Sequence, residues 1–148
     1  MLKYAILGLI GLTVAFAVYV RLAPSDPARW HVSFYPKPPD TYPAADGFQI
    51  VRQIDDPAAV LARLDTIIMA TPRTVRLAGS VEEGMITYVT RSKLWGFPDY
   101  TTVYAGADDT IEGTFGPLLK VDGRLRFGQS DMGVNRARIE GWLAELDA

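Results

Sequence analysis

The sequence predicts an α+β protein in which an N-terminal transmembrane helix precedes a two-layer sandwich, with two helices on one face of an antiparallel sheet. Three observations lead to this prediction. Of the first 21 residues, 16 are apolar, whereas the rest of the 148-residue chain has an ordinary soluble composition. Beyond residue 47, strand-like segments follow one another across short connections, which is typical of antiparallel sheets. Two amphipathic segments, at 57–70 and 132–146, have the periodicity of helices that pack on such a sheet.

The N-terminal segment has the composition of a membrane-spanning helix. Residues 4–20 form an uncharged apolar run, flanked by Lys3 and Arg21. Such a run spans about 25 Å as a helix, and the adjoining Leu2 and Leu22 extend it to the thickness of a hydrocarbon core. Because the run has no polar face, it does not resemble the core helix of a soluble protein.

A cleaved signal peptide is the alternative interpretation of this segment. Ala15-Phe16-Ala17 fits the small-x-small cleavage pattern, but the apolar run continues unbroken through Val20, which favours an uncleaved anchor. Both interpretations place the rest of the chain outside the cytoplasm. We therefore predict an anchor at 1–22 whose N-terminus lies inside.

Composition excludes several kinds of site. The chain has no cysteine and one histidine, His31, which excludes a disulfide framework, a zinc–thiolate site, an iron–sulfur cluster and a cysteine nucleophile. The part after Arg21 has 13 basic and 17 acidic residues and no dense basic stripe, so we expect no nucleic-acid partner. We likewise expect no metal and no cofactor.

A proline-rich segment at 23–46 separates the anchor from the domain. It contains six of the ten prolines, so it is predicted to be an extended spacer without a regular helix or a central strand. Four aromatic residues are unusual in a free linker: Trp30, Phe34, Tyr35 and Tyr42. They either pack on the domain or lie in the membrane interface, or they form a contact surface for another membrane protein, for which Trp30, Phe34 and Tyr35 are the candidates.

The domain at 47–148 begins with a strand and a helix. Residues 48–54 alternate apolar and polar side chains, which predicts a strand. Asp56 and Pro57 are a typical N-cap and first residue, and Thr71-Pro72 ends the helix that they begin. The strands predicted next are Thr74–Ala78, Met85–Ser92, Asp99–Ala105, Thr110–Phe115 and Gly123–Phe127. Turn residues separate them at Gly79-Ser80, Glu83-Gly84, Asp108-Asp109 and Asp122-Gly123.

Two segments carry unusual combinations of polar and aromatic residues, at 91–100 and 128–139. Together they resemble the two signatures of domain-of-unknown-function family 1499, uncharacterised bacterial and plastid proteins. The matching residues are Arg91, Ser92, Gly96, Phe97, Asp99, Ser130, Asp131, Gly133, Val134, Asn135 and Arg136. The resemblance covers about 47–146, although 124–127, Arg-Leu-Arg-Phe, departs from the Ser-Arg pair expected there. It implies the same fold and a bacterial inner-membrane protein with its C-terminal domain in the periplasm, without an established activity.

The second signature has a structural and a functional interpretation. Ser130 or Asp131 can accept the free amide protons of the last helix, and Asn135 lies on its inward stripe, where a buried amide needs partners from the 91–100 segment. Arg136 can pair with Glu140 one helical turn later. Alternatively, Arg91, Ser92, Asp99, Ser130, Asp131, Asn135 and Arg136 bind a ligand or partner. In the first signature, Trp95 and Phe97 either fill the core or form an aromatic lip.

Three functions stay open at this point. The favoured one is a protein-binding module that serves as an accessory or assembly component of an inner-membrane complex. The second is a domain that binds a small apolar or lipid-like ligand between sheet and helices, with Trp95 and Phe97 at the mouth. The third, a hydrolase or transferase, is disfavoured because no catalytic set is recognisable; it requires Arg91, Asp99 and Asp131 to meet in one cleft.

Overall fold

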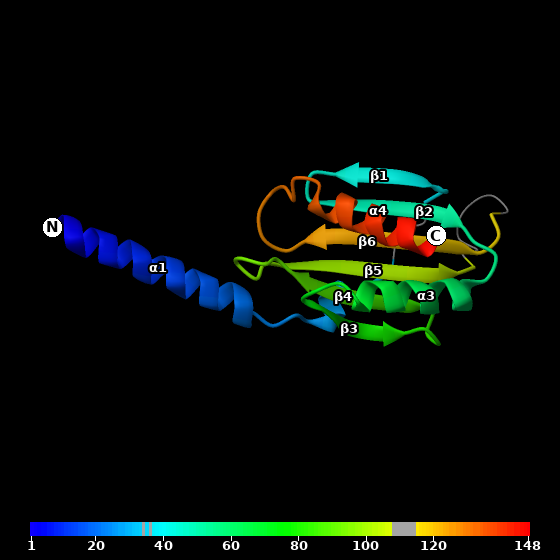
Figure 1. Cartoon of the computed structure of the whole chain (residues 1–148), viewed down its shortest axis with the longest axis horizontal. Helices are drawn as coiled ribbons and strands as arrows, with labels where there is room; N and C mark the ends of the chain where they lie inside the picture. The colour runs from blue at the N-terminus through cyan, green and yellow to red at the C-terminus, as the bar shows by residue number, and fades with distance from the viewer. Residues whose placement is uncertain (34, 36, 108–114) are drawn as a thin grey trace.

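The computed structural model describes residues 1–33, 35, 37–107 and 115–148. Figure 1 shows a long N-terminal helix that extends away from one end of a sheet, which carries two further helices. The elements in chain order are α1 (Leu2–Leu22), α2 (Pro27–Trp30), β1 (Asp40–Ala44), β2 (Gly47–Gln53), α3 (Pro57–Met69), β3 (Thr74–Ser80), β4 (Met85–Arg91), β5 (Pro98–Gly106), β6 (Leu118–Leu125) and α4 (Val134–Leu146).

The described strands form one six-stranded sheet in the order β1-β2-β6-β5-β4-β3, and every neighbouring pair is antiparallel. The strands β3, β4, β5 and β6 are neighbours in chain order and antiparallel, as predicted. The predicted turn at Asp122-Gly123 is wrong, because both residues lie inside β6, where Gly123 pairs with Phe48 and Thr101. Most of the strand predicted at 110–115, and the turn at 108–109, lie outside the described residues.

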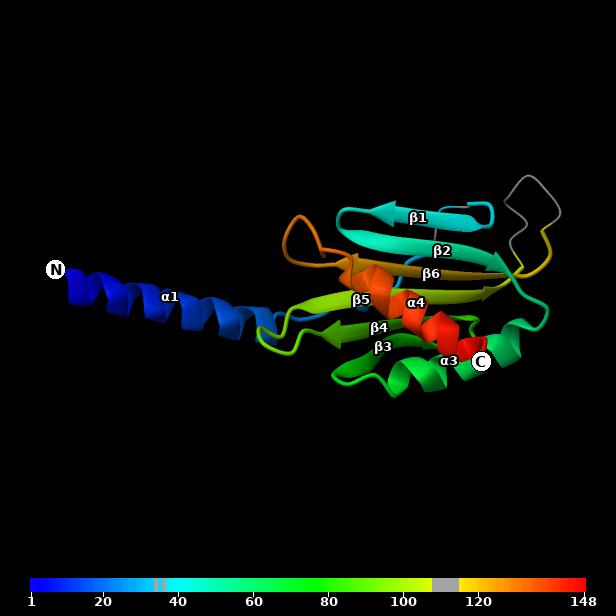
Figure 2. The same cartoon turned by 45° about the horizontal axis from the view of Figure 1, so that its top comes forward.

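Two helices cover one face of the sheet, as predicted (Figure 2). The α3 helix begins as its sequence indicates: Asp56 accepts a hydrogen bond from the Ala59 amide at 3.0 Å, and Pro57 is the first residue. The space between α3, α4 and the sheet is filled by one core of apolar side chains, which includes Phe48, Ile68 and Ile139. Helices and sheet therefore form the predicted two-layer sandwich.

The opposite face of the sheet is covered by the segment that was expected to be a spacer. Trp30, at the end of α2, stacks on Tyr100 of β5 with ring centroids 3.8 Å apart, and His31 Nδ1 lies 2.9 Å from Thr87 Oγ1. The following residues add β1 to the sheet edge, where Pro43 needs no hydrogen bond on its outer side. The described residues of 23–46 therefore belong to the folded domain, and the prediction of a free spacer is wrong.

The α1 helix projects from the end of the sheet at which β4 ends and β5 begins (Figures 1 and 2). It is the one helix among the described residues that is long and apolar enough to cross a membrane, a property that signal sequences share. Its large apolar side chains are exposed along almost its entire length, whereas Val20 and Ala23, at its C-terminal end, are buried against the domain.

Candidate functional site

The first signature forms the loop between β4 and β5, which we call the docking loop (92–97). Ser92 closes this loop at both ends. Its amide donates to the Phe97 carbonyl at 2.9 Å, its hydroxyl accepts from the Phe97 amide at 3.0 Å, and its carbonyl accepts from the Gly96 amide at 3.2 Å. Ser92 thus fixes the loop's shape through backbone partners.

Two arginines connect the docking loop with the C-terminal end of α1: one donates from the end of β4, where the loop starts, to α1, and the other donates from α1 to the loop. Arg91 donates to the Val20 carbonyl at 3.3 Å and to the Gly96 carbonyl at 2.9 Å. Arg21 donates in return to the Leu94 carbonyl at 2.7 Å. Cations at a helix C-terminus are favourable because the last carbonyls lack intrahelical partners.

Gly96 is required at its position for two reasons. Its φ of 75° lies in the left-handed region, and a Cβ atom there would come within 3.0 Å of Arg21 Cγ. The glycine of the first signature therefore serves the contact between the docking loop and α1.

Aromatic rings continue this contact along the side of α1. Phe97 lies 6.2 Å from Phe16 and 6.0 Å from Phe127, and Phe127 lies 6.1 Å from Tyr19, all between ring centroids. Trp95 and Phe97 do not belong to the core between sheet and helices. The prediction that they fill the core is therefore wrong: Trp95 is 39% exposed, and the neighbouring Leu94 is 75% exposed.

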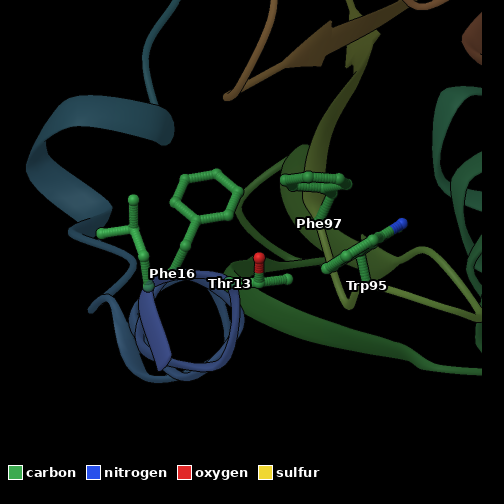
Figure 3. A pocket seen from close by; sticks show the side chains of 5 residues that line it. Thr13, Phe16, Trp95 and Phe97 are labelled. Atoms are coloured by element: carbon green, nitrogen blue, oxygen red, sulfur yellow. The ribbon is translucent and has the colours of Figure 1, made fainter. Parts of the chain in front are cut away.

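Between α1 and the docking loop lies an apolar groove of about 480 Å³. Leu12, Thr13 and Phe16 line it from α1, and Trp95 and Phe97 line it from the loop. Figure 3 shows the side chains of Thr13 and Phe16 across from those of Trp95 and Phe97. Because a helix rises about 1.5 Å per residue, the groove reaches about 15 Å from the C-terminal end of α1 toward its N-terminus. The docking loop thus lies beside the apolar body of the helix.

A second hollow, of about 430 Å³, lies beside the groove, and we call it the basic pocket. Four cationic residues line it: Arg21, Arg73, Arg91 and Lys93. None of the four forms an ion pair with an acidic residue in the part of the chain that the structure describes. The side-chain hydrogen bonds of the three arginines go to backbone carbonyls, including that of Arg73 Nε to the Arg91 carbonyl at 3.0 Å.

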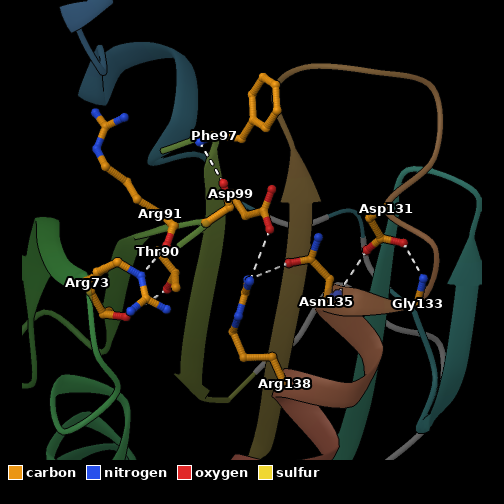
Figure 4. Close-up of polar contacts among 11 residues, drawn as sticks. Arg73, Thr90, Arg91, Phe97, Asp99, Asp131, Gly133, Asn135 and Arg138 are labelled. Atoms are coloured by element: carbon orange, nitrogen blue, oxygen red, sulfur yellow. Dashed lines mark hydrogen bonds and ion pairs between the residues drawn. The ribbon is translucent and has the colours of Figure 1, made fainter. Parts of the chain in front are cut away.

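Residues of both signature segments form a polar cluster at the start of α4, which we call the latch: Asp99 from the first, and Asp131, Asn135 and Arg138 from the second (Figure 4). Arg138 donates to Asp99 at 3.1 Å and to Asn135 Oδ1 at 3.0 Å. Asn135 is fully buried against Gly123 of β6. Burial raises the pKa of Asp99 although the Arg138 guanidinium acts to lower it. The latch ties the start of α4 to β5.

Asp131 accepts free amide protons at the start of α4, as its position predicts, and it does so from two residues before the N-cap residue Gly133. One carboxylate oxygen accepts from the Gly133 amide at 2.9 Å and the other from the Asn135 amide at 3.0 Å. Ser130 contributes more locally, by accepting from the Met132 amide at 3.2 Å. Burial acts to raise the pKa of Asp131, but the backbone hydrogen bonds from Gly133 and Asn135, together with Arg138, outweigh it and lower this pKa.

A family model described as "Protein of unknown function (DUF1499)" matches residues 21–146. The chain belongs to this family. The match confirms the resemblance, and it includes the segment 23–46, consistent with the packing of that segment on the sheet. A comparison with curated proteins found no match.

The DUF1499 signature residues do not meet in one site. Arg91 points away from Asp99 toward the end of α1 (Figure 4), because neighbouring strands place Arg91 opposite Pro98 and Asp99 opposite Thr90. Arg136 is exposed and pairs with Glu140 at 2.8 Å. The convergence of Arg91, Asp99 and Asp131 that a hydrolase or transferase was expected to need is therefore not formed. Among the described residues, no group of three acidic or histidine side chains is suited to hold a metal.

Of the membrane-proximal candidates, Trp30 is buried on the sheet, Tyr35 is exposed, and Phe34 lies outside the described residues. Arginines that the sequence did not single out fasten this segment. Arg124 donates to the Trp30 carbonyl at 2.9 Å, and Arg126 donates to the Pro24 carbonyl at 2.9 Å. The departure from the expected Ser-Arg pair at 124–127 was the sequence signal for these two arginines: Arg124 lies in β6, and Arg126 follows the last residue of that strand, Leu125.

Proposed function

We propose that α1 anchors the protein in a bacterial inner membrane as a single pass, with the domain in the periplasm. The exposed apolar surface along α1 supports this, because a contiguous patch of that size is unfavourable in water. The contacts of α1 with the domain also favour an uncleaved anchor. Cleavage after Ala17 would remove Phe16, which packs against Phe97 and lines the groove.

We propose further that the protein binds a lipid-like ligand at the groove between α1 and the docking loop. The observation that carries this proposal is the apolar lining of the groove, to which Trp95 and Phe97 contribute from the domain. Its place differs from the expected one: the space between sheet and helices is occupied by the core, so the ligand site lies outside that layer. A groove at the depth of the acyl chains suits a membrane amphiphile.

Native mass spectrometry of the full chain, released from phosphatidylcholine nanodiscs, tests this proposal. We expect wild type to retain one phospholipid and Trp95→Ala to retain at least about fivefold less, since the ring forms one wall of the groove. Met69→Ala, which truncates an exposed apolar side chain on α3, is the matched control and should behave as wild type. Equal retention by wild type and Trp95→Ala, or none by wild type, would contradict the proposal.

A second candidate is the binding of a membrane protein, as an accessory or assembly component. The observation in its favour is Met132 in the second signature, which is 90% exposed and has a φ of 50°. An apolar side chain held outward by a left-handed backbone suits a partner contact. Pull-down of the full chain from crosslinked membranes should then lose a stoichiometric partner on Met132→Lys but keep it on Met69→Lys. Equal recovery in both variants, or a partner-free monomer, would contradict this candidate.

A further inference from the structure

We infer that the junction of α1 and the docking loop recognises an anionic phospholipid, with the phosphate-bearing headgroup in the basic pocket and an acyl chain in the groove. This inference rests on the proposed lipid-like ligand and names its chemistry. It comes from the adjacency of two hollows that share one loop: Trp95 and Phe97 face the groove, while Ser92, Lys93 and Gly96 line the basic pocket.

The charge of the basic pocket is a local feature. The chain after Arg21 has a net charge of −4, yet four cations gather around this one hollow, and its lining among the described residues includes no acidic side chain. Elsewhere in the described part, several arginines have carboxylate partners: Arg52, Arg76, Arg124, Arg136 and Arg138. Cations that lack an internal counter-charge, beside the membrane helix, are suited to a phosphate.

Backbone contacts hold three of these cations in place before any ligand binds, and Arg21 is the first, through its hydrogen bond to the Leu94 carbonyl. Arg91 is fixed by the Val20 and Gly96 carbonyls, and Arg73 by the Arg91 carbonyl, as Figure 4 shows for Arg73. Lys93 is exposed on the docking loop. The pocket therefore combines fixed guanidinium groups with one flexible ammonium at its edge, which lowers the ordering cost of binding an anion.

The positions of the two hollows along α1 match those of the headgroup and the acyl chain of a phospholipid in the same leaflet. Arg21 is five residues beyond Phe16 and nine beyond Leu12, which corresponds to about 7 to 14 Å along the helix. A phospholipid aligned with α1 would place its phosphate beside Arg21 and its acyl chain beside Phe16 and Trp95. Soluble phosphate would use only the pocket, so the adjoining groove favours a lipid as the source of the anion.

Competition between two lipids tests the inference. The full chain in detergent receives equimolar phosphatidylglycerol and phosphatidylcholine, and native mass spectrometry counts the retained lipid. We expect wild type to prefer phosphatidylglycerol about tenfold or more, and Arg73→Gln/Lys93→Gln to lose this preference while still binding lipid. Lys93→Gln alone, which removes no hydrogen bond or ion pair within the described part of the chain, should lose part of this preference. The control is the double variant Arg63→Gln/Arg136→Gln, which removes two exposed cations outside the pocket and so changes the net charge equally. It should keep the preference for phosphatidylglycerol.

The outcomes separate this inference from the proposal beneath it. Retained lipid without headgroup preference, or a preference that survives Arg73→Gln/Lys93→Gln, overturns the inference and leaves the groove intact. Absence of any retained lipid overturns both. Displacement of the lipid by millimolar inorganic phosphate would assign the pocket to a soluble anion and overturn the lipid as its source.

Discussion

The two signature segments use similar residue types for different purposes. In the latch, Asp99 pairs with Arg138 at 3.1 Å, and both side chains are about 15% exposed. At the docking loop, Lys93 and the adjoining Arg91 of β4 and Arg21 of α1 have no carboxylate partner among the described residues. Leu94 in the loop is 75% exposed. The charges of the latch are neutralised internally, whereas, within the described part of the chain, the arginines at the junction with α1 bind only backbone carbonyls and keep an uncompensated charge. This difference supports the proposed ligand site at the junction with α1.

Removal of the cation from the latch should have the largest effect on stability. Arg138→Ala leaves Asp99 largely buried without a counter-charge, and we expect a loss of about 3 kcal/mol in the free energy of unfolding at pH 7. Urea unfolding of the full chain in detergent, followed by near-UV circular dichroism, measures it. Arg136→Ala, which breaks an exposed pair, should cost about 0.5 kcal/mol or less. Similar losses in the two variants would contradict the latch.

The pH dependence of this loss has a defined sign. The pKa of Asp99 is already raised by burial, and removal of Arg138 raises it further, so the folded variant binds a proton more tightly than the unfolded chain. The deficit of Arg138→Ala should therefore shrink as the pH falls from 7 toward 4. A deficit that is constant over this range would indicate lost packing instead of an unpaired carboxylate.

A Cβ atom at Gly123 should break the contact between Asn135 and the sheet. It would lie 2.9 Å from both Asn135 Oδ1 and Ile139 Cδ1, so Gly123→Ala should cost about 2 kcal/mol through overpacking. Gly141→Ala is the matched control, since no atom lies within 4 Å of its Cβ position on α4. The control should stabilise the protein by about 0.5 kcal/mol. Unchanged stability in Gly123→Ala would mean that α4 does not rest on β6 as described.

Loss of the α4 cap should have a smaller effect. Asp131→Ala removes the carboxylate that accepts from the Gly133 and Asn135 amides, at a cost of about 1 kcal/mol at pH 7. Because the folded-state pKa of Asp131 is lowered, its contribution is present above the unfolded value of about 3.9 and is lost as the pH falls through the folded value. Equal destabilisation at pH 7 and pH 3 would contradict a cap by the ionised group.

The smallest effect on stability is expected in the basic pocket. Lys93 is exposed and has no ion pair among the described residues, so Lys93→Gln should change the unfolding free energy by less than about 0.5 kcal/mol. The same urea titration measures it. A loss comparable to that of Arg138→Ala would mean that the pocket charges serve the fold after all.

Local rules predicted those parts of the molecule that depend on neighbours in sequence. The caps at Asp56 and Asp131 and the Arg136–Glu140 pair are within four residues of their partners, and all are present. The helix stripes likewise indicated which faces of α3 and α4 are buried.

Features set by distant partners were not predictable in this way. Pro43 argued against a strand, but an edge strand tolerates it. The dipeptide Asp122-Gly123 is typical of a turn, yet Gly123 lies in β6. A glycine is needed there because Asn135 occupies the space that a side chain at this position would fill. The face on which Arg91 lies depends on strand pairing, and its partner Val20 is 71 residues away. Arg138 acquires its role only from the approach of β5 to α4.

The most direct test of the central claim is the depth of the docking loop in the bilayer. The chain has no cysteine, so a spin label at Leu94→Cys, or at Glu83→Cys in the turn at the opposite end of β4, is unique. In nanodiscs, electron paramagnetic resonance should show Leu94→Cys colliding often with oxygen and rarely with a water-soluble nickel chelate, and Glu83→Cys the reverse. A label at residue 94 that is as accessible to the nickel chelate as the label at 83 would contradict a docking loop that lies beside α1 in the membrane.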